Sequence, residues 1–146
     1  MPENRLVDEW ALRRLVQQYA YAVDRNDPDL FVSLFVEDAV VEGPGFCFAG
    51  HPQLAGVPGQ LARQFRGTMH CVFNHLVAIE GDAARGETYC IAYHGILGED
   101  GQPMTLDWAI RYQDRYVRRG PAWLIAYRRL AVEWTRTGPV TLLPDR

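Results

Sequence analysis

Residues 68–81, "TMHCVFNHLVAIEG", begin the part of the chain that decides the fold. Three further segments rich in β-branched and aromatic residues follow, at residues 84–97, 104–119 and 122–136. This composition is typical of strands, and the turn signals "EGDA", "GEDGQP" and "RGPA" separate the segments. Because short turns join antiparallel neighbours, residues 68–135 are predicted to form one strongly curved antiparallel sheet.

The segments before this sheet predict helices. In residues 6–25, apolar side chains recur every three or four positions, as on one face of a helix. In "NDPDLF", Asp27 can cap and Pro28 can begin a second, short helix, which is expected to reach about Val36. The sequence then predicts a short strand in "EDAVVEG", a loop over residues 43–59, and a third helix in "PGQLARQFRG".

This order of elements predicts the fold class. Helices followed by a long meander favour an α+β domain, with the helices packed on one face of the curved sheet and the first helix across its concave side. No internal repeat and no break in composition marks a second domain. Residues 1–146 are therefore predicted to form one domain.

Composition and charge narrow the classes of function. Apolar residues make up 48% of the chain, which argues against disorder. The formal charge is -3, with 15 basic and 18 acidic residues, which argues against nucleic acid as a partner. Apolar runs are shorter than the roughly 20 residues of a membrane span. The polar start, "MPENRLVDEW", does not resemble a signal peptide, so a cytoplasmic location is expected.

The metal-ligating residue types form no recognisable motif. The three cysteines are widely spaced and make no CxxC pair, and no metal spacing relates the four histidines: Cys47, Cys71, Cys90, His51, His70, His75 and His94. His70 and His75 are five residues apart in a predicted strand and are expected to face opposite sides. There is also no Gly-rich phosphate loop and no GxSxG elbow. We therefore expect chemistry by side chains alone, without a metal or cofactor.

A carboxylate closes the predicted first helix in "YAYAVDRND", residues 19–27. Asp24 lies in line with Val16 and Ala20 at spacings of four, on a largely apolar face. A buried carboxylate is costly unless it is paired or hydrogen-bonded. Asp24 is thus either an exposed residue of the last turn or a functional group that faces a cavity, and the helix pattern favours the exposed alternative.

Polar residues also interrupt the predicted strands. His70 shares a face with Val72, Asn74, Leu76 and Ala78, so His70 and Asn74 would be the polar groups of an apolar hollow if that face looks inward. The alternative is a core histidine bonded to a backbone carbonyl. Trp108, Ile110 and Tyr112 share a face by ordinary strand alternation.

The last predicted strand contains two adjacent arginines. Arg128 alternates with Leu124, Ala126, Leu130 and Val132, whereas Arg129 alternates with Trp123, Ile125 and Tyr127. Which arginine faces inward depends on the register of the strand. In the first helix, Tyr19 and Tyr21 could line a shared pocket, although core packing is the favoured interpretation for Tyr21.

Three stretches together resemble a known family: "YAYAVDRNDPDLFVSLFVEDAVVEG", "TMHCVFNHLVAIEGDAARGETY" and "YQDRYVRRGPAWLIAYRRL". They are similar to the SnoaL-like family of the nuclear transport factor 2-like superfamily, over about residues 6–135. The resemblance implies a cone-shaped α+β barrel, in which helices wrap a curved sheet around a deep pocket. Within this superfamily, the pattern is most similar to the dehydratase-like branch.

The resemblance also implies roles for individual residues. The branch uses a His–Asp dyad, which falls on His70 and Asp24, and its polar residue five positions before the Asp falls on Tyr19. An arginine five residues after a Trp falls on Arg128. Val41 and Thr68 stand where a dehydrochlorinase of the branch has a pocket Trp and a pocket Cys, which argues against dehydrochlorination of that enzyme's particular substrate here. Four residues are expected to line the substrate site: Val41, Thr68, Asn74 and Trp108.

The expected activity is that of a cofactor-independent lyase, either a dehydratase or an eliminase. Its partner would be a small hydrophobic molecule, alicyclic, aromatic or polyketide-like, and His94 is the alternative base. An isomerase or polyketide cyclase would use the same dyad. A non-catalytic scaffold, similar to the β subunits of ring-hydroxylating dioxygenases, is the alternative from another class. The resemblance further implies a homodimer or homotrimer, for which Trp123, Ile125 and Tyr127 are the expected outward-facing apolar patch.

Overall fold

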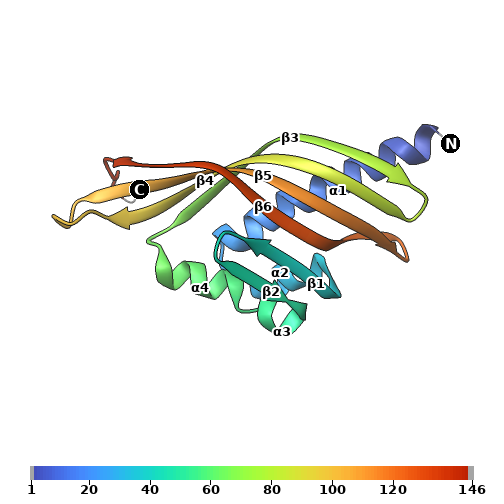
Figure 1. Ribbon diagram of the computed structural model, residues 1–146, viewed down its shortest axis with the longest axis horizontal. Coiled ribbons are helices and arrows are strands. Elements are labelled where there is room, and N and C mark those ends of the chain that lie inside the picture. The colour runs from blue at the N-terminus through green and yellow to red at the C-terminus, as the bar shows by residue number, and fades with distance from the viewer. Residues whose placement is uncertain (1, 145–146) are drawn as a thin grey trace.

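The computed structural model describes residues 2–144. Its helices and strands follow one another along the chain as shown in Figure 1. The helices are α1 (Pro2–Asp24), α2 (Pro28–Ser33), α3 (Gly50–Leu54) and α4 (Val57–Gln64). The strands are β1 (Phe35–Gly43), β2 (Phe46–Ala49), β3 (Thr68–Glu80), β4 (Ala83–Leu97), β5 (Pro103–Arg119) and β6 (Ala122–Pro139).

All six strands belong to one sheet, in the order β2-β1-β6-β5-β4-β3. The strands β3 to β6 pair antiparallel with their sequence neighbours, which confirms the predicted meander. The short strand β1 was also predicted, and it pairs parallel with β6. The predicted loop over residues 43–59 is wrong, because the chain turns back at Gly45, whose φ of 78° suits glycine, and forms β2 and α3.

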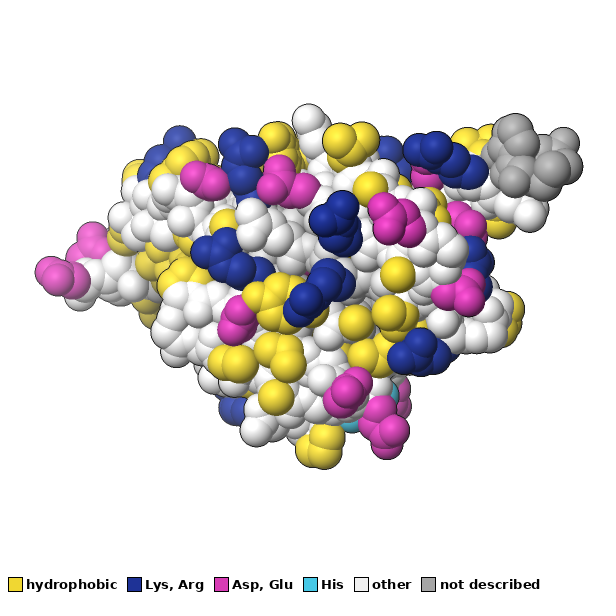
Figure 2. Space-filling model, turned by 45° about the vertical axis from the view of Figure 1, so that its right-hand side comes forward, with side chains coloured by type: hydrophobic (Ala, Val, Ile, Leu, Met, Phe, Trp, Pro, Cys, Tyr) yellow, Lys and Arg dark blue, Asp and Glu magenta, His cyan; other side chains and the backbone are white. Residues whose placement is uncertain are grey.

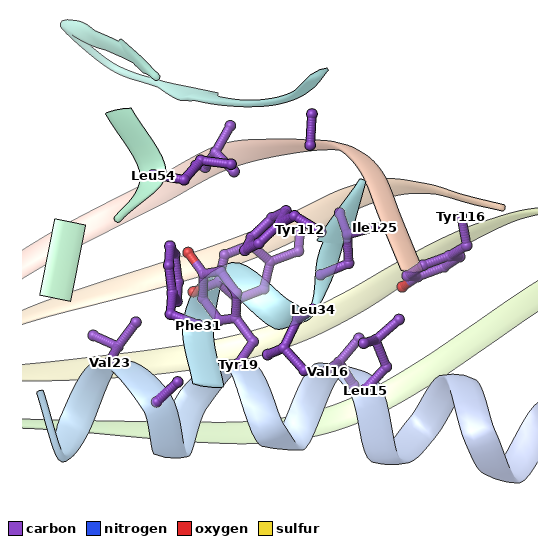
Figure 3. Packing of buried hydrophobic residues seen from close by; sticks show 14 of the residues in the cluster. Leu15, Val16, Tyr19, Val23, Phe31, Leu34, Leu54, Tyr112, Tyr116 and Ile125 are labelled. Carbon is purple, nitrogen blue, oxygen red and sulfur yellow. The ribbon is translucent and has the colours of Figure 1, made fainter. Parts of the chain in front are cut away.

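The long helix α1 lies across the concave side of the sheet (Figure 1). Its buried side chains recur at the predicted helical spacing: Leu12, Leu15, Val16, Tyr19, Ala22 and Val23. Figure 3 shows several of them directed toward Tyr112, Tyr116 and Ile125 of the sheet. Burial of these apolar faces is the main force that holds the helix on the sheet.

The start of α2 is as predicted, whereas its end is not. The backbone N–H of Leu30 donates a hydrogen bond to the Asp27 carboxylate at 3.0 Å, so Asp27 caps the helix. The helix ends at Ser33 rather than Val36, because Phe35 already belongs to β1. The third helix, α4, lies close to its predicted position.

A β-bulge in β3 overturns the predicted placement of Asn74. The register between β3 and β4 shifts between Val72 and His75, so one extra residue on β3 exchanges the two faces beyond it. His70 and Val72 lie on the concave side, but Asn74 is exposed and Leu76 is 81% exposed. His75, predicted to face away from His70, instead lies against Tyr116 on the concave side.

A second bulge, in β6, overturns the predicted outward-facing patch. Tyr116 pairs with Ile125 and Arg115 with Tyr127, so Ala126 is the extra residue. Trp123 and Ile125 are consequently buried on the concave side, together with Arg128. Large apolar side chains do remain exposed on the convex side of the sheet, but they are a different set, which includes Met69, Phe73, Leu76, Tyr89, Tyr93 and Trp134.

The face of the molecule in Figure 2 carries charges of both signs. Figure 2 shows arginine and carboxylate side chains intermixed over the face in view, without one large patch of either sign. The helices of residues 2–144 include none that is long and apolar enough to cross a membrane.

Candidate active site

A cavity of about 310 Å³ lies between α4, the β1–β2 hairpin and the concave side of the sheet. Its wall is mostly apolar, with side chains such as Val41, Phe46, Leu61, Ile110 and Leu130. Among the residues that the structure describes, no Asp, Glu, Lys or Arg lines it. The polar groups of the wall belong to seven residues: Tyr19, Gln60, Gln64, His70, His94, Trp108 and Tyr112.

His70 and Asp24 form the predicted pair at this cavity. Asp24 is the last residue of α1 and His70 lies near the start of β3, so the end of the helix meets the beginning of the strand. The His70 Nδ1–H donates to Asp24 Oδ1 at 2.7 Å, and the backbone N–H of His70 donates to Asp24 Oδ2 at 2.9 Å. The predicted hydrogen bond is thus confirmed, and the exposed alternative for Asp24 is wrong.

This contact determines the ionisation of Asp24 and the tautomer of His70. Burial raises the pKa of Asp24, but hydrogen bonds from the side chain and backbone of His70 and from Thr68 outweigh it, so the pKa lies below its usual value. The ionised carboxylate only accepts hydrogen bonds, so His70 carries its proton on Nδ1. In the neutral ring, Nε2 then presents a lone pair, and no atom of residues 2–144 makes a hydrogen bond with it.

The residues expected to line the substrate site divide into three groups. Val41 and Trp108 line the cavity as expected. Thr68 does not; its hydroxyl donates to Asp24 Oδ1 at 2.9 Å and helps to hold the carboxylate. Asn74 lies outside the cavity because of the bulge in β3.

Tyr19 lines the cavity from α1. Its ring packs against Phe31 and Tyr112, with centroid distances of 5.2 and 5.7 Å (Figure 3). Burial raises the pKa of Tyr19, so its hydroxyl stays protonated and can donate a hydrogen bond. Tyr21, for which core packing was favoured, is instead 54% exposed and stacks with Arg25.

Arg128, rather than Arg129, faces the concave side, but it does not reach the cavity. It is fully buried and donates two hydrogen bonds to Asp114, both at 2.8 Å. The rings of Tyr19 and Tyr112 lie against its guanidinium, at 4.3 and 3.9 Å. Asp114 accepts from Nε and Nη2 only, and Nη1 is buried without a hydrogen-bond partner within residues 2–144. Because Arg128 does not line the cavity, the geometry does not support the expected direct contact with substrate.

His94 is a second cavity histidine, which the sequence suggested only as an alternative base. Its Nδ1–H donates to the Leu106 carbonyl at 2.9 Å, and its ring centroid lies 5.9 Å from that of His70. Burial lowers the pKa of His94 and favours the neutral ring, with Nε2 as an acceptor. Strand alternation with Cys90 and Ala92, both buried, is the signal that could have placed it.

Gln60 and Gln64 also line the cavity, and the sequence analysis did not identify them. They share one face of α4 with Val57 and Leu61 at spacings of three and four, which is the signal that could have found them. As for metals, the described part of the chain contains no group of three or more His, Cys, Asp or Glu side chains that could hold an ion.

Comparisons with known proteins agree with the fold. The model of the SnoaL-like domain family matches residues 4–129. A candidate scytalone dehydratase from Novosphingobium aromaticivorans is 26% identical, with 98% of this chain and 94% of that chain covered and a TM-score of 0.82. Hexachlorocyclohexane dehydrochlorinase LinA-type3 from Novosphingobium barchaimii is 15% identical, with 99% and 100% covered and a TM-score of 0.87.

A third similar structure has no stated function. Rv3472(D26N) from Mycobacterium tuberculosis is 24% identical, with 90% of this chain and 75% of that chain covered and a TM-score of 0.78. A search of curated proteins finds no match. Likeness at such low identity shows the fold, whereas the match to the family model covers most of the chain. The chain therefore belongs to the SnoaL-like family of the nuclear transport factor 2-like superfamily and has its cone-shaped α+β fold.

Proposed function

We propose that the protein is a cofactor-independent lyase, a dehydratase or related eliminase, that acts on a small hydrophobic alicyclic, aromatic or polyketide-like molecule. One observation carries the proposal. The ring of His70 is held at Nδ1 by an ionised carboxylate, Nε2 has no hydrogen-bond partner within residues 2–144, and the residue lines an apolar cavity. A base in this arrangement has a defined tautomer and a stabilised protonated form.

The proposed reaction is the loss of water from a β-hydroxy ketone or a compound of similar acidity. His70 Nε2 takes the proton from the carbon next to the carbonyl, and the electrons of the C–H bond form an enolate. Asp24 stabilises the resulting imidazolium. When the enolate collapses, a C=C bond forms and the neighbouring C–O bond breaks. The leaving hydroxyl takes the proton back from His70, so the products are an enone and water.

Tyr19 is the proposed donor to the enolate oxygen. It lines the cavity, and burial keeps its hydroxyl protonated. Preorganised donors at a developing oxyanion are a major source of rate enhancement. Arg128 has an indirect part in this proposal, because it holds the Tyr19 and Tyr112 rings in place. It is a positioning residue and does not contact the substrate.

The proposal can be tested on its first step. In D₂O, 1-tetralone should exchange the protons next to its carbonyl for deuterium in the presence of the protein, followed by NMR. His70→Ala should abolish the catalysed exchange. His51→Ala is a matched control, because the His51 ring contacts the Phe35 carbonyl and does not line the cavity. Equal exchange by wild-type protein and His70→Ala would contradict the assignment of the base.

A second probe tests the reaction class. With 3-hydroxy-1-tetralone, a dehydratase should release water and, after tautomerisation of the enone, form 1-naphthol, which is detectable by its fluorescence. An isomerase or polyketide cyclase begins with the same proton abstraction, so exchange without water loss would favour those activities. A non-catalytic scaffold should produce neither exchange nor 1-naphthol above the buffer rate.

A further inference from the structure

One wall of the cavity is formed by a single short helix, α4. The side chains of Val57, Gln60, Leu61 and Gln64 all line the cavity from this helix. Spacings of three and four place them on one face. An apolar residue and a glutamine therefore alternate along this face.

The two glutamine amides are the polar groups of this wall. Both residues are exposed while lining the cavity, so they lie at its mouth. Within residues 2–144, neither side-chain amide has a hydrogen-bond partner in the protein. Each amide offers two donors and one acceptor oxygen. The mouth therefore has neutral hydrogen-bonding groups that the protein itself does not engage, next to an apolar interior.

The cavity lacks charged groups that could bind an anion. No Lys or Arg of the described chain lines it, and the nearby arginines of the α4 region, Arg63 and Arg66, are not part of its wall. Arg128 lies close behind the tyrosines, but Asp114 already neutralises it. A carboxylate or phosphate in this cavity would lose its hydration without gaining a counter-ion, which is unfavourable.

We propose that Gln60 and Gln64 determine specificity by binding a neutral carbonyl or hydroxyl oxygen at the mouth, so that the site takes uncharged oxygen-bearing molecules and disfavours carboxylates and phosphates. The inference rests on the proposed function insofar as it names the substrate class of the same site. The apolar body of the ligand would fill the interior, where His70 and Trp108 lie. The amides would then contribute selectivity for oxygen, whereas the apolar wall would contribute affinity.

The test measures binding, independently of turnover. Dissociation constants of three probes of similar size are measured by calorimetry: naphthalene, 1-tetralone and 2-naphthoate. The proteins are wild type, the double variant Gln60→Leu/Gln64→Leu, and the control Gln17→Leu. Gln17 is exposed on α1 and does not line the cavity, so the control makes the same chemical change elsewhere.

Wild type and the control should bind 1-tetralone about 2- to 12-fold more tightly than naphthalene, as expected for one neutral hydrogen bond. They should bind 2-naphthoate more weakly than 1-tetralone. In the double variant the part of the tetralone preference that the amides confer should be lost, with naphthalene binding retained; a hydrogen bond from Tyr19 accounts for any remainder, which adding Tyr19→Phe to the double variant should remove. An unchanged preference in the double variant, tighter binding of 2-naphthoate than of 1-tetralone, or no binding of either neutral probe would overturn the proposal.

The same measurement in a His70→Ala protein separates this inference from the proposed activity. If the dyad assignment fails but the amides determine specificity, His70→Ala retains the tetralone preference and the double variant loses it. If the amides have no such role, the double variant retains the preference whatever the result of the exchange experiment. The two proposals therefore fail by different observations.

Discussion

Two pairs of acidic and basic side chains lie on the concave side of this molecule, and they differ in what they leave free. In the pair of Asp24 and His70, one ring nitrogen contacts the carboxylate at 2.7 Å, and His70 lines the cavity. In the pair of Asp114 and Arg128, two hydrogen bonds of 2.8 Å join groups that are both fully buried. We call the first the open pair, because one ring nitrogen has no hydrogen-bond partner within residues 2–144. We call the second the closed pair, because Asp114 accepts from Nε and Nη2 of Arg128 away from the cavity, although Nη1 is buried without a partner in the described chain.

This difference decides which pair can perform proton chemistry. A guanidinium remains protonated at any physiological pH and has no acceptor site, so Arg128 cannot take a proton. An imidazole held at Nδ1 can take one at Nε2. The closed pair instead supports the cavity from behind, because Tyr19 and Tyr112 pack on the guanidinium.

The largest expected effect comes from breaking the open pair. His70→Ala should lower turnover about 10²- to 10⁴-fold on 3-hydroxy-1-tetralone, the usual contribution of a general base. Asp24→Asn should also lower it strongly, because an amide can turn and favour the other tautomer. The double variant should be scarcely slower than the worse single variant, since the two residues act as a unit. Steady-state kinetics, with KM changing much less than kcat, would check this; near-normal turnover by His70→Ala would refute it.

Breaking the closed pair should affect stability. Arg128→Met alone leaves the Asp114 carboxylate buried without its charged partner, and should lower the free energy of unfolding by about 3–5 kcal/mol. Replacing both, Arg128→Met with Asp114→Leu, should recover most of that loss because no buried charge remains unpaired. Urea unfolding monitored by circular dichroism measures both. A double variant as unstable as Arg128→Met would show that the pair itself, rather than the unpaired charge, is responsible.

Acidification should have a smaller effect on the free energy of unfolding, and this effect should not come from the arginine of the closed pair. Burial lowers the pKa of His94 and His75 below the ordinary value of 6.5. The unfolded chain then binds more protons than the native state below about pH 6.5, so stability should fall as the pH falls from there. The lowered pKa of Asp24 should add a further loss below about pH 4.

The measurement is urea unfolding between pH 7.5 and 4. His94→Gln should show a shallower decline than wild type between pH 6.5 and 5, because one of the two histidines with a lowered pKa is removed. The closed pair should not contribute through its arginine, since the pKa of Arg128 lies far above this range. A decline of the same slope in His94→Gln would contradict the assignment to His94.

Substitutions on the convex side of the sheet are expected to have the smallest effect on either pair. Its exposed apolar side chains, which include Phe73 and Trp134, are the proposed contact in a homodimer or homotrimer. Phe73→Ser with Trp134→Ser should shift the protein toward the monomer in light scattering at micromolar concentration. Leu142→Ser, at an exposed apolar residue near the end of the chain, is the control. Wild-type protein that is already monomeric would refute the proposal, whereas His70-dependent exchange per chain should hardly change.

The sequence by itself determined most elements of this fold and their order, with β2 and α3 as the exceptions. The periodicity of residues 6–25, the cap at Asp27 and the turn signals between strands are local features, and local features are visible in a sequence. The pair of Asp24 and His70 was predicted through the family resemblance rather than from spacing, because the two residues are 46 positions apart.

Only the tertiary structure decided which side chains meet. A single extra residue exchanges the faces of a strand, so the bulges in β3 and β6 moved Asn74 out of the cavity and Ile125 into the core. Asp114 closes off Arg128 because the register of β5 and β6 sets them opposite each other. Strand pairing depends on packing on both faces of the sheet, between residues that are far apart in the sequence. The alternation pattern of one strand therefore does not predict it.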